Sequence, residues 1–134
     1  MANLVEVEGI GEAYAKKLAA AGIRTTDALL AKGATPEGRK EIAAKSGISA
    51  KMILEWVNHV DLFRIKGVGQ EYADLLEAAG VDTVPELAQR KPGNLVEKMA
   101  EVNKKKKLVR QLPVETQVAR WIAQAKELPR KIKY

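Results

Sequence analysis

The sequence predicts an all-α protein that contains an internal repeat. Apolar residues recur at helical spacing, whereas the alternation of period two that strands need never persists. Residues 7–29 also resemble residues 65–87 at an offset of 58, with matching Gly, Tyr, Ala, Leu and Thr positions. Together these observations predict a pseudo-twofold bundle of two related halves, with about eight short helices.

The first half shows three helix signals. A helix over Gly11–Ala21 has Tyr14 and Leu18 on one face, and Gly22 is a left-handed stop. Thr35-Pro36-Glu37 is typical of a helix start. Ser49 caps a helix that runs to Leu62. On that helix an apolar stripe at i, i+3, i+4 and i+7 indicates a buried face. It comprises Ile53, Trp56, Val57 and Val60.

The second half repeats these signals. Thr83-Val84-Pro85-Glu86 combines a Thr cap, Pro in the first turn and a capping-box Glu. Pro92-Gly93-Asn94 breaks the chain before a helix over Leu95–Asn103. Pro113 breaks it again before a last helix over Val114–Leu128, which Pro129 ends. Arg130–Tyr134 is then a basic tail.

The repeat also predicts the domain organisation. Trp56 corresponds to Trp121 at an offset of 65, so the second half carries seven extra residues, near 102–113. We expect a first repeat over residues 1–62 and a second over 63–134. The joint has no Gly/Pro/Ser linker, and this favours one compact domain.

The charge is concentrated at one end of the sequence. The 134 residues carry a net charge of +6, with 23 Lys+Arg and 17 Asp+Glu. Residues 1–62 are balanced, residues 63–97 have two more acids than bases, and residues 98–134 have eleven bases and three acids. The last segment, which includes Lys104–Lys107, is a candidate surface for phosphates or for an acidic protein.

The composition excludes several classes of site. No cysteine is present, so a disulfide scaffold, a thiol nucleophile and a Cys-ligated metal are excluded. The one histidine, His59, has no triad partner around it and is expected at the surface. We expect no metal, no cofactor and no enzymatic activity. Neither a membrane span nor a signal peptide is evident, and this favours a cytoplasmic protein.

The most informative motif occurs twice, as Gly9-Ile10-Gly11 and Gly67-Val68-Gly69. Each copy precedes a helix with matching Tyr, Ala and Leu and a following Ala-Ala-Gly. The motif resembles the helix-hairpin-helix family, in which two short helices are joined by a tight glycine hairpin. The resemblance implies contact with a nucleic-acid backbone that does not depend on base sequence.

The physical properties of such a hairpin also favour contact with a nucleic-acid backbone. Glycine permits positive φ and close backbone approach, and the first amides of a helix can hold a phosphate oxygen. The candidate nucleic-acid-binding residues are Gly9, Gly11, Lys16, Lys17, Lys66, Gly67, Gly69, Lys104, Lys105, Lys106, Lys107 and Arg110.

The acidic residues near the hairpins oppose this interpretation. Glu12 and Glu71 follow the two turns, and Glu6 and Glu8 precede the first. In the sequence the glycine motif and the basic segment also lie apart. The alternative is a protein-interaction or scaffold module with purely structural hairpins. Trp56 and Trp121 are expected to be buried anchors rather than base-stacking platforms.

A further resemblance extends from about Leu4 to Leu128. Over this length the chain is similar to an uncharacterised bacterial family known only as a domain of unknown function. The match is carried by residues 54–57, 61–69 and 75–84. It implies a paired helix-hairpin-helix fold, and it implies neither an activity nor any catalytic residue.

Overall fold

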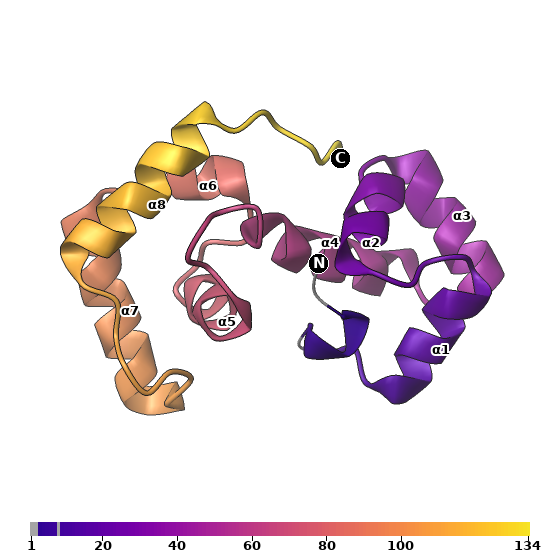
Figure 1. Ribbon diagram of the computed structural model, residues 1–134, viewed down its shortest axis with the longest axis horizontal. Helices are drawn as coiled ribbons and strands as arrows, with labels where there is room; N and C mark the ends of the chain where they lie inside the picture. The colour runs from indigo at the N-terminus through magenta and orange to yellow at the C-terminus, as the bar shows by residue number, and fades with distance from the viewer. Residues whose placement is uncertain (1–2, 8) are drawn as a thin grey trace. The chain divides into compact units, whose positions relative to one another are not determined.

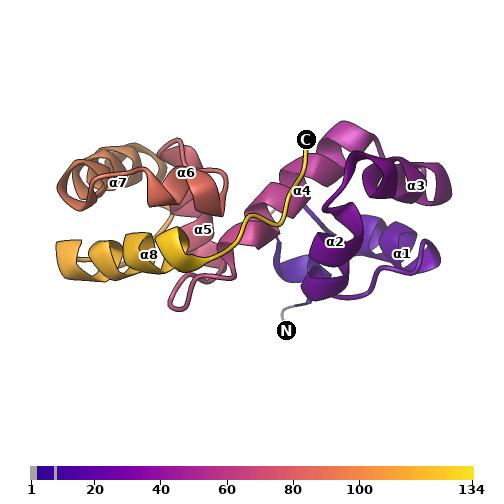
Figure 2. The ribbon, with the colours of Figure 1, turned by 90° about the horizontal axis from the view of Figure 1, so that it is seen from above.

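The computed structural model describes residues 3–7 and 9–134, and all regular structure in them is helical (Figures 1 and 2). This confirms the predicted all-α class and the count of eight α-helices. The elements are η1 (Leu4–Glu6), α1 (Glu12–Ala20), α2 (Thr26–Gly33), α3 (Pro36–Ser46), α4 (Ala50–Leu62), α5 (Gln70–Ala78), α6 (Val84–Ala88), α7 (Pro92–Lys106) and α8 (Glu115–Glu127). The pseudo-twofold arrangement stays a prediction.

The chain divides into two compact units. Unit 1 comprises Met1–Asp61 together with Lys131–Tyr134, and unit 2 comprises Leu62–Arg130. The division after Asp61 lies beside the joint that the repeat predicts. The last four residues belong to unit 1, although the sequence order assigns them to the second repeat.

Helix starts follow the predicted caps. The hydroxyl of Thr35 accepts from the amide of Gly38 at 3.0 Å, and that of Ser49 accepts from Met52 at 3.2 Å. At α6 the Thr83 hydroxyl accepts from the Glu86 amide at 3.4 Å. The Glu86 carboxylate reaches back to the amide of Asp82 rather than to the cap residue itself. Side-chain capping therefore fixes several of the boundaries that the sequence indicates.

Helix α7 differs from its prediction. A helix over Leu95–Asn103 was expected, followed by a basic loop, but α7 begins at Pro92 and ends at Lys106. Proline is favoured in the first turn of a helix, and lysines in the last turn interact favourably with the helix dipole. Three of the four consecutive lysines are therefore helical, and the loop that follows is shorter than predicted.

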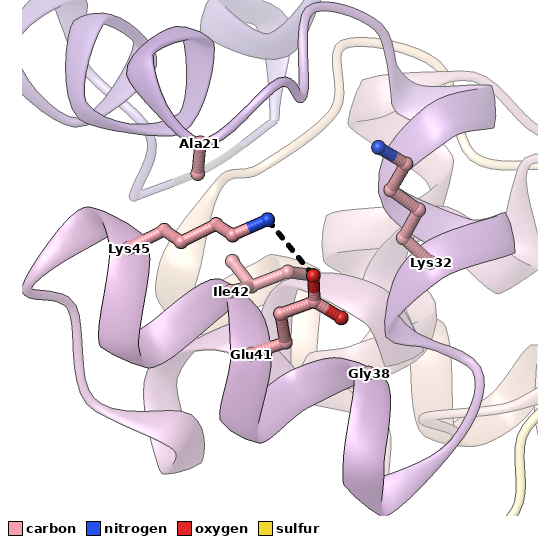
Figure 3. Close-up of a pocket in the computed structure, with 6 residues that line it drawn as sticks. All are labelled: Ala21, Lys32, Gly38, Glu41, Ile42 and Lys45. Carbon is pink, nitrogen blue, oxygen red and sulfur yellow. Dashed lines mark hydrogen bonds and ion pairs between the residues drawn. The ribbon is translucent and has the colours of Figure 1, made fainter.

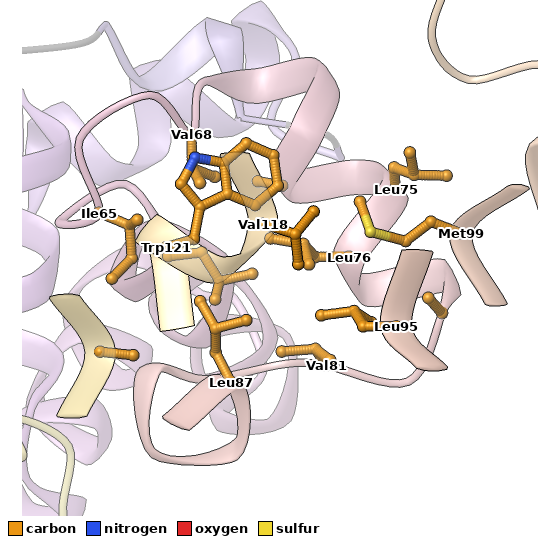
Figure 4. Packing of buried hydrophobic residues seen from close by; sticks show 14 of the residues in the cluster. Ile65, Val68, Leu75, Leu76, Val81, Leu87, Leu95, Met99, Val118 and Trp121 are labelled. Atoms are coloured by element: carbon orange, nitrogen blue, oxygen red, sulfur yellow. The ribbon is translucent and has the colours of Figure 1, made fainter. Parts of the chain in front are cut away.

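Each unit has a hydrophobic core built around one tryptophan. Trp56 is 4% exposed in unit 1, and Trp121 is 1% exposed in unit 2 (Figure 4). Each packs against the tyrosine of its own hairpin helix, Tyr14 or Tyr72, with ring centroids 5.2 Å apart in both pairs. Such a pair adds about 0.5–1.5 kcal/mol beyond area burial. The tryptophans are thus anchors, as predicted.

The histidine prediction was wrong. His59 is only 3% exposed. It lies three residues after Trp56 on α4, so it shares the buried face of that helix.

No helix in the described part of the chain has the length and apolar character needed to cross a membrane. Nor do the described residues contain a group of three or more His, Cys, Asp or Glu side chains that could hold a metal ion.

The carboxylate of Asp82, at the start of α6, gives a pH-dependent prediction. Burial raises the pKa of Asp82 above 3.8, and the charges of Glu86 and Glu77 raise it further. The folded protein therefore binds this proton more tightly than the unfolded chain, and stability is lost as the pH rises through the folded-state pKa. We expect Asp82→Asn to raise the free energy of unfolding at pH 7 by up to about 0.5 kcal/mol, as measured by urea denaturation. The gain should disappear below pH 3.8, where Asp82 is protonated in both states. A gain that is equal at both pH values would contradict this origin.

Candidate nucleic-acid interface

The first glycine of each hairpin is required by the fold. Gly9 and Gly67 have φ values of +89° and +94°. A Cβ at Gly9 would lie 3.1 Å from Nε1 of Trp56, and one at Gly67 would lie 3.0 Å from Nε1 of Trp121. A side chain here would be strained by the left-handed backbone, and the tryptophan would have to shift by a few tenths of an ångström. These two glycines are structural.

The second glycine of each hairpin has no such requirement. Gly11 and Gly69 have φ values of −86° and −100°, which any residue adopts. A Cβ at either position meets nothing within 4 Å. Both are exposed N-caps without a side-chain cap, so the amides of the following turn have no acceptor within the helix. The space beside the Cα of each of these two glycines is therefore open.

This contrast within one hairpin predicts different results for two alanine variants. Gly67→Ala is expected to destabilise unit 2 by about 2 kcal/mol, from left-handed strain and the Trp121 contact. Gly69→Ala is expected to keep wild-type stability, because its Cβ meets open space, and to lower duplex DNA affinity several-fold, because it adds a methyl group to the lining of the proposed phosphate site. Thermal unfolding and DNA titration of both variants check this. Equal loss of stability in the two would contradict it.

The first hairpin has mixed charge. Glu6 and Glu12 are exposed near the turn, and Glu8 lies outside the described residues. Lys16 and Lys17 are exposed on α1, with the Lys17 ammonium 5.6 Å from the centroid of the Tyr14 ring. The acids and the bases offset one another, so this hairpin offers at most a weak phosphate contact.

The second hairpin forms one side of a hollow of about 490 Å³. Its lining residues are Gly67, Gly69, Gln70, Glu71, Tyr72, Arg110 and Gln111. The Tyr72 hydroxyl donates to the carbonyl of Gln111 at 3.2 Å, which holds the segment after α7 against α5. The glycine motif and part of the basic segment, which lie apart in the sequence, therefore meet here. Arg110 supplies a guanidinium, and Glu71 supplies the one opposing charge in the lining.

The backbone of the second turn is held by α8. The amide of Lys66 donates to Oε1 of Gln124 at 2.9 Å, and Nε2 of Gln124 donates to the Lys66 carbonyl at 3.2 Å. The Lys66 side chain is exposed. This pair of bonds fixes the turn before any ligand arrives.

The four consecutive lysines, which we call the lysine turn (Lys104–Lys107), also have a fixed backbone. Asn103 brackets the turn, because its side chain donates to the Val109 carbonyl at 3.1 Å and accepts from the Val109 amide at 3.0 Å. All four lysines are exposed. The turn is a positioned group of cations rather than a loose loop.

Lys107 has an unusual backbone conformation. Its φ is 50°, and it is the one non-glycine residue with positive φ in the described part of the chain. Lys107 is the C-cap residue that follows α7, whereas the C-cap residue that follows α3 in unit 1 is Gly47, with φ 76°. A lysine here costs backbone energy that glycine would not.

Lys107→Gly is therefore expected to stabilise unit 2 by about 1 kcal/mol, because glycine adopts this conformation without strain. The change removes one of the four cations, so DNA affinity should fall while stability rises. Chemical denaturation and titration of the same sample separate the two effects. A loss of stability would contradict the strain at this position.

Unit 1 has a second, smaller hollow of about 260 Å³, shown in Figure 3. It is lined by Ala21, Lys32, Gly38, Glu41, Ile42 and Lys45. The Lys45 ammonium donates to Glu41 at 2.8 Å, and this hydrogen bond and its charge lower the pKa of Glu41. Both side chains are exposed, so the pair is an ordinary i,i+4 surface pair held in its ionised form. It provides no poised acid or base.

Comparison with known families decides the classification. The sequence matches the family described as "Domain of unknown function (DUF4332)" over residues 8–128. The chain belongs to this family. The DUF4332 domain thus includes both hairpins, both tryptophans and the lysine turn, and residues 129–134 lie beyond the match. No curated protein and no solved structure matches the chain.

Two elements of this interface escaped sequence analysis. Asn103 and Gln111 shape the segment after α7, but neither belongs to a motif. The seven extra residues of the repeat comparison pointed to the segment that contains Arg110. They did not indicate which hairpin it would meet.

Proposed function

We propose that this DUF4332 protein is a non-enzymatic nucleic-acid-binding module that contacts the DNA backbone without base specificity. The observation that carries the proposal is the hollow of unit 2, where Arg110 lies with Gly67 and Gly69. The resemblance of the two hairpins to the helix-hairpin-helix family supports it. A cytoplasmic location, where the protein would meet DNA, is part of the proposal.

The chemistry of the hollow suits a phosphate diester. The first-turn amides of α5 and the Arg110 guanidinium are donors only, and guanidinium groups bind phosphate oxygens in a bidentate manner. Glu71 opposes the anion by about 1 kcal/mol at an exposed distance near 4 Å, and Arg110 offsets this. The lysine turn, which lies three residues before Arg110 in the chain, adds cations that release counterions on binding.

In this proposal unit 1 has a secondary role. Gly9, Gly11, Lys16 and Lys17 form the matching hairpin, but it lacks the inserted segment and has exposed Glu6 and Glu12 nearby. It contributes one weak backbone contact.

The direct test is a titration of labelled duplex and single-stranded DNA at several salt concentrations. Backbone binding predicts an affinity that falls steeply with salt and depends little on base sequence. An absence of binding at low salt would refute the proposal.

The second candidate function is a scaffold that binds an acidic protein. The exposed apolar side chains of Leu112 and Val114, at 39% and 62%, favour it because they lie within the basic segment, just after Arg110. Capture of a defined partner at physiological salt, lost in Leu112→Ser/Val114→Ser, would support this function. Unchanged capture by that variant would oppose it.

A further inference from the structure

Residues 131–134 are bound to unit 1 in the manner of a peptide ligand. The amide of Lys133 donates to the carbonyl of Ala34 at 2.7 Å, and Nη2 of Arg39 donates to the carbonyl of Lys133 at 2.8 Å. The segment has no helix or strand of its own (Figure 2). Its main chain is therefore held on both sides of Lys133 by groups of α3 and of the turn that precedes it.

One side chain of this segment is buried and the other three are exposed. Ile132 is 2% exposed, whereas Lys131 and Lys133 on either side are exposed. The Tyr134 hydroxyl donates to Oδ1 of Asn58 on α4 at 2.9 Å. Main-chain hydrogen bonds and a pocket for one aliphatic side chain are elements by which proteins recognise extended peptides.

Arg39 is the side chain that binds this segment from α3. It is only 5% exposed, and its Nη1 donates to the carbonyl of Gly33 at 2.8 Å. Helices α3 and α7 both begin with proline. Arg39 lies three residues after the proline of α3, and the residue three positions after the proline of α7 is Leu95, which is fully buried. Burying a guanidinium is costly unless it is hydrogen-bonded, and Arg39 meets this requirement by donating to the main-chain carbonyls of Gly33 and Lys133.

We propose that unit 1 contains a peptide-binding groove that includes Arg39 and is occupied by the protein's own residues 131–134. The groove takes a short segment with a branched aliphatic side chain between two basic residues, followed by an aromatic one. The proposal does not depend on nucleic-acid binding. It makes the tail an internal ligand that occludes the groove.

The test uses the full chain and a fluorescein-labelled, amidated peptide of residues 129–134. Ile132→Asp places a carboxylate in the apolar site and is expected to release the tail, so the peptide should bind this variant and not the wild type. Lys131→Asp is the matched control, because the same change at an exposed neighbour should leave the groove occupied. Arg39→Met in the Ile132→Asp chain should weaken peptide binding by about tenfold or more.

Hydrogen exchange on the unmodified protein gives an independent readout that needs no variant to fold. The Lys133 amide is expected to exchange about tenfold or more slowly than the Lys131 amide. Equal exchange of the two amides would overturn the proposal. So would peptide binding that is the same in wild type and Ile132→Asp, or a tail that seats only in a second copy of the chain.

Discussion

Replacing Lys104, Lys105 and Lys106 with alanine is expected to weaken duplex DNA binding by about a hundredfold near 100 mM salt. These are the exposed lysines in the last turn of α7, and each phosphate contact contributes about 0.9 to the slope of log affinity against log salt. The slope should therefore fall by about 2.7. Lys107 is left unchanged, because it has a positive φ and a substitution there would also change the backbone strain.

The control for this variant changes the net charge equally in unit 1. Arg24, Lys40 and Lys51 are exposed, and replacing all three with alanine lowers the net charge by the same amount. This control should lose affinity only a few-fold, through the weaker long-range field. Equal losses in the two variants would show that overall charge, not the surface of unit 2, attracts DNA.

Gly38→Ala is expected to unfold unit 1, at a cost of about 3 kcal/mol or more. Gly38 lies in the first turn of α3, and a Cβ there would overlap the carbonyl oxygen of Lys32 on α2. A backbone oxygen cannot move aside as the end of a flexible side chain can. The two helices would have to separate, which would expose buried Leu29 and Ile42.

The two tryptophans allow the unfolding of each unit to be measured separately. Because Trp56 lies in unit 1 and Trp121 in unit 2, the indole N–H signals in an NMR spectrum report on the two units separately. The Trp56 signal should move to an unfolded position in Gly38→Ala. Gly11→Ala is the control, because its Cβ meets open space at an ordinary φ. A native spectrum for Gly38→Ala would contradict the close approach of α2 and α3.

Local sequence signals predicted the helices well. Thr35, Ser49 and Thr83 act as caps, and the helical stripes correctly placed Trp56 and Trp121 in the cores. Such signals act over three or four residues, so the sequence carries them directly. The predicted end of α7 at Asn103 was wrong, because the consecutive lysines were assigned to a loop although lysine is a good helix former.

The candidate site was only partly predictable. The glycine pattern identified both hairpins. It did not show that Gly67 and Gly69 have different structural roles, because that difference depends on the contact of Gly67 with Trp121, 54 residues later in the sequence. The position of Arg110 beside the second hairpin depends on the path of an irregular segment. The partnership of Arg39 with Lys133 spans 94 residues. No local pattern specifies contacts of this range.

The second hairpin and the inserted segment are expected to bind one phosphate together. A double-mutant cycle with Gly69→Ala and Arg110→Ala, measured by duplex titration at low salt, tests this expectation most directly. If both residues serve the same phosphate, the double variant should lose less than the two single losses combined, with a coupling of at least about 0.5 kcal/mol. The parallel cycle of Gly11→Ala with Arg110→Ala should be additive. Additive losses in the Gly69–Arg110 cycle would contradict the shared site.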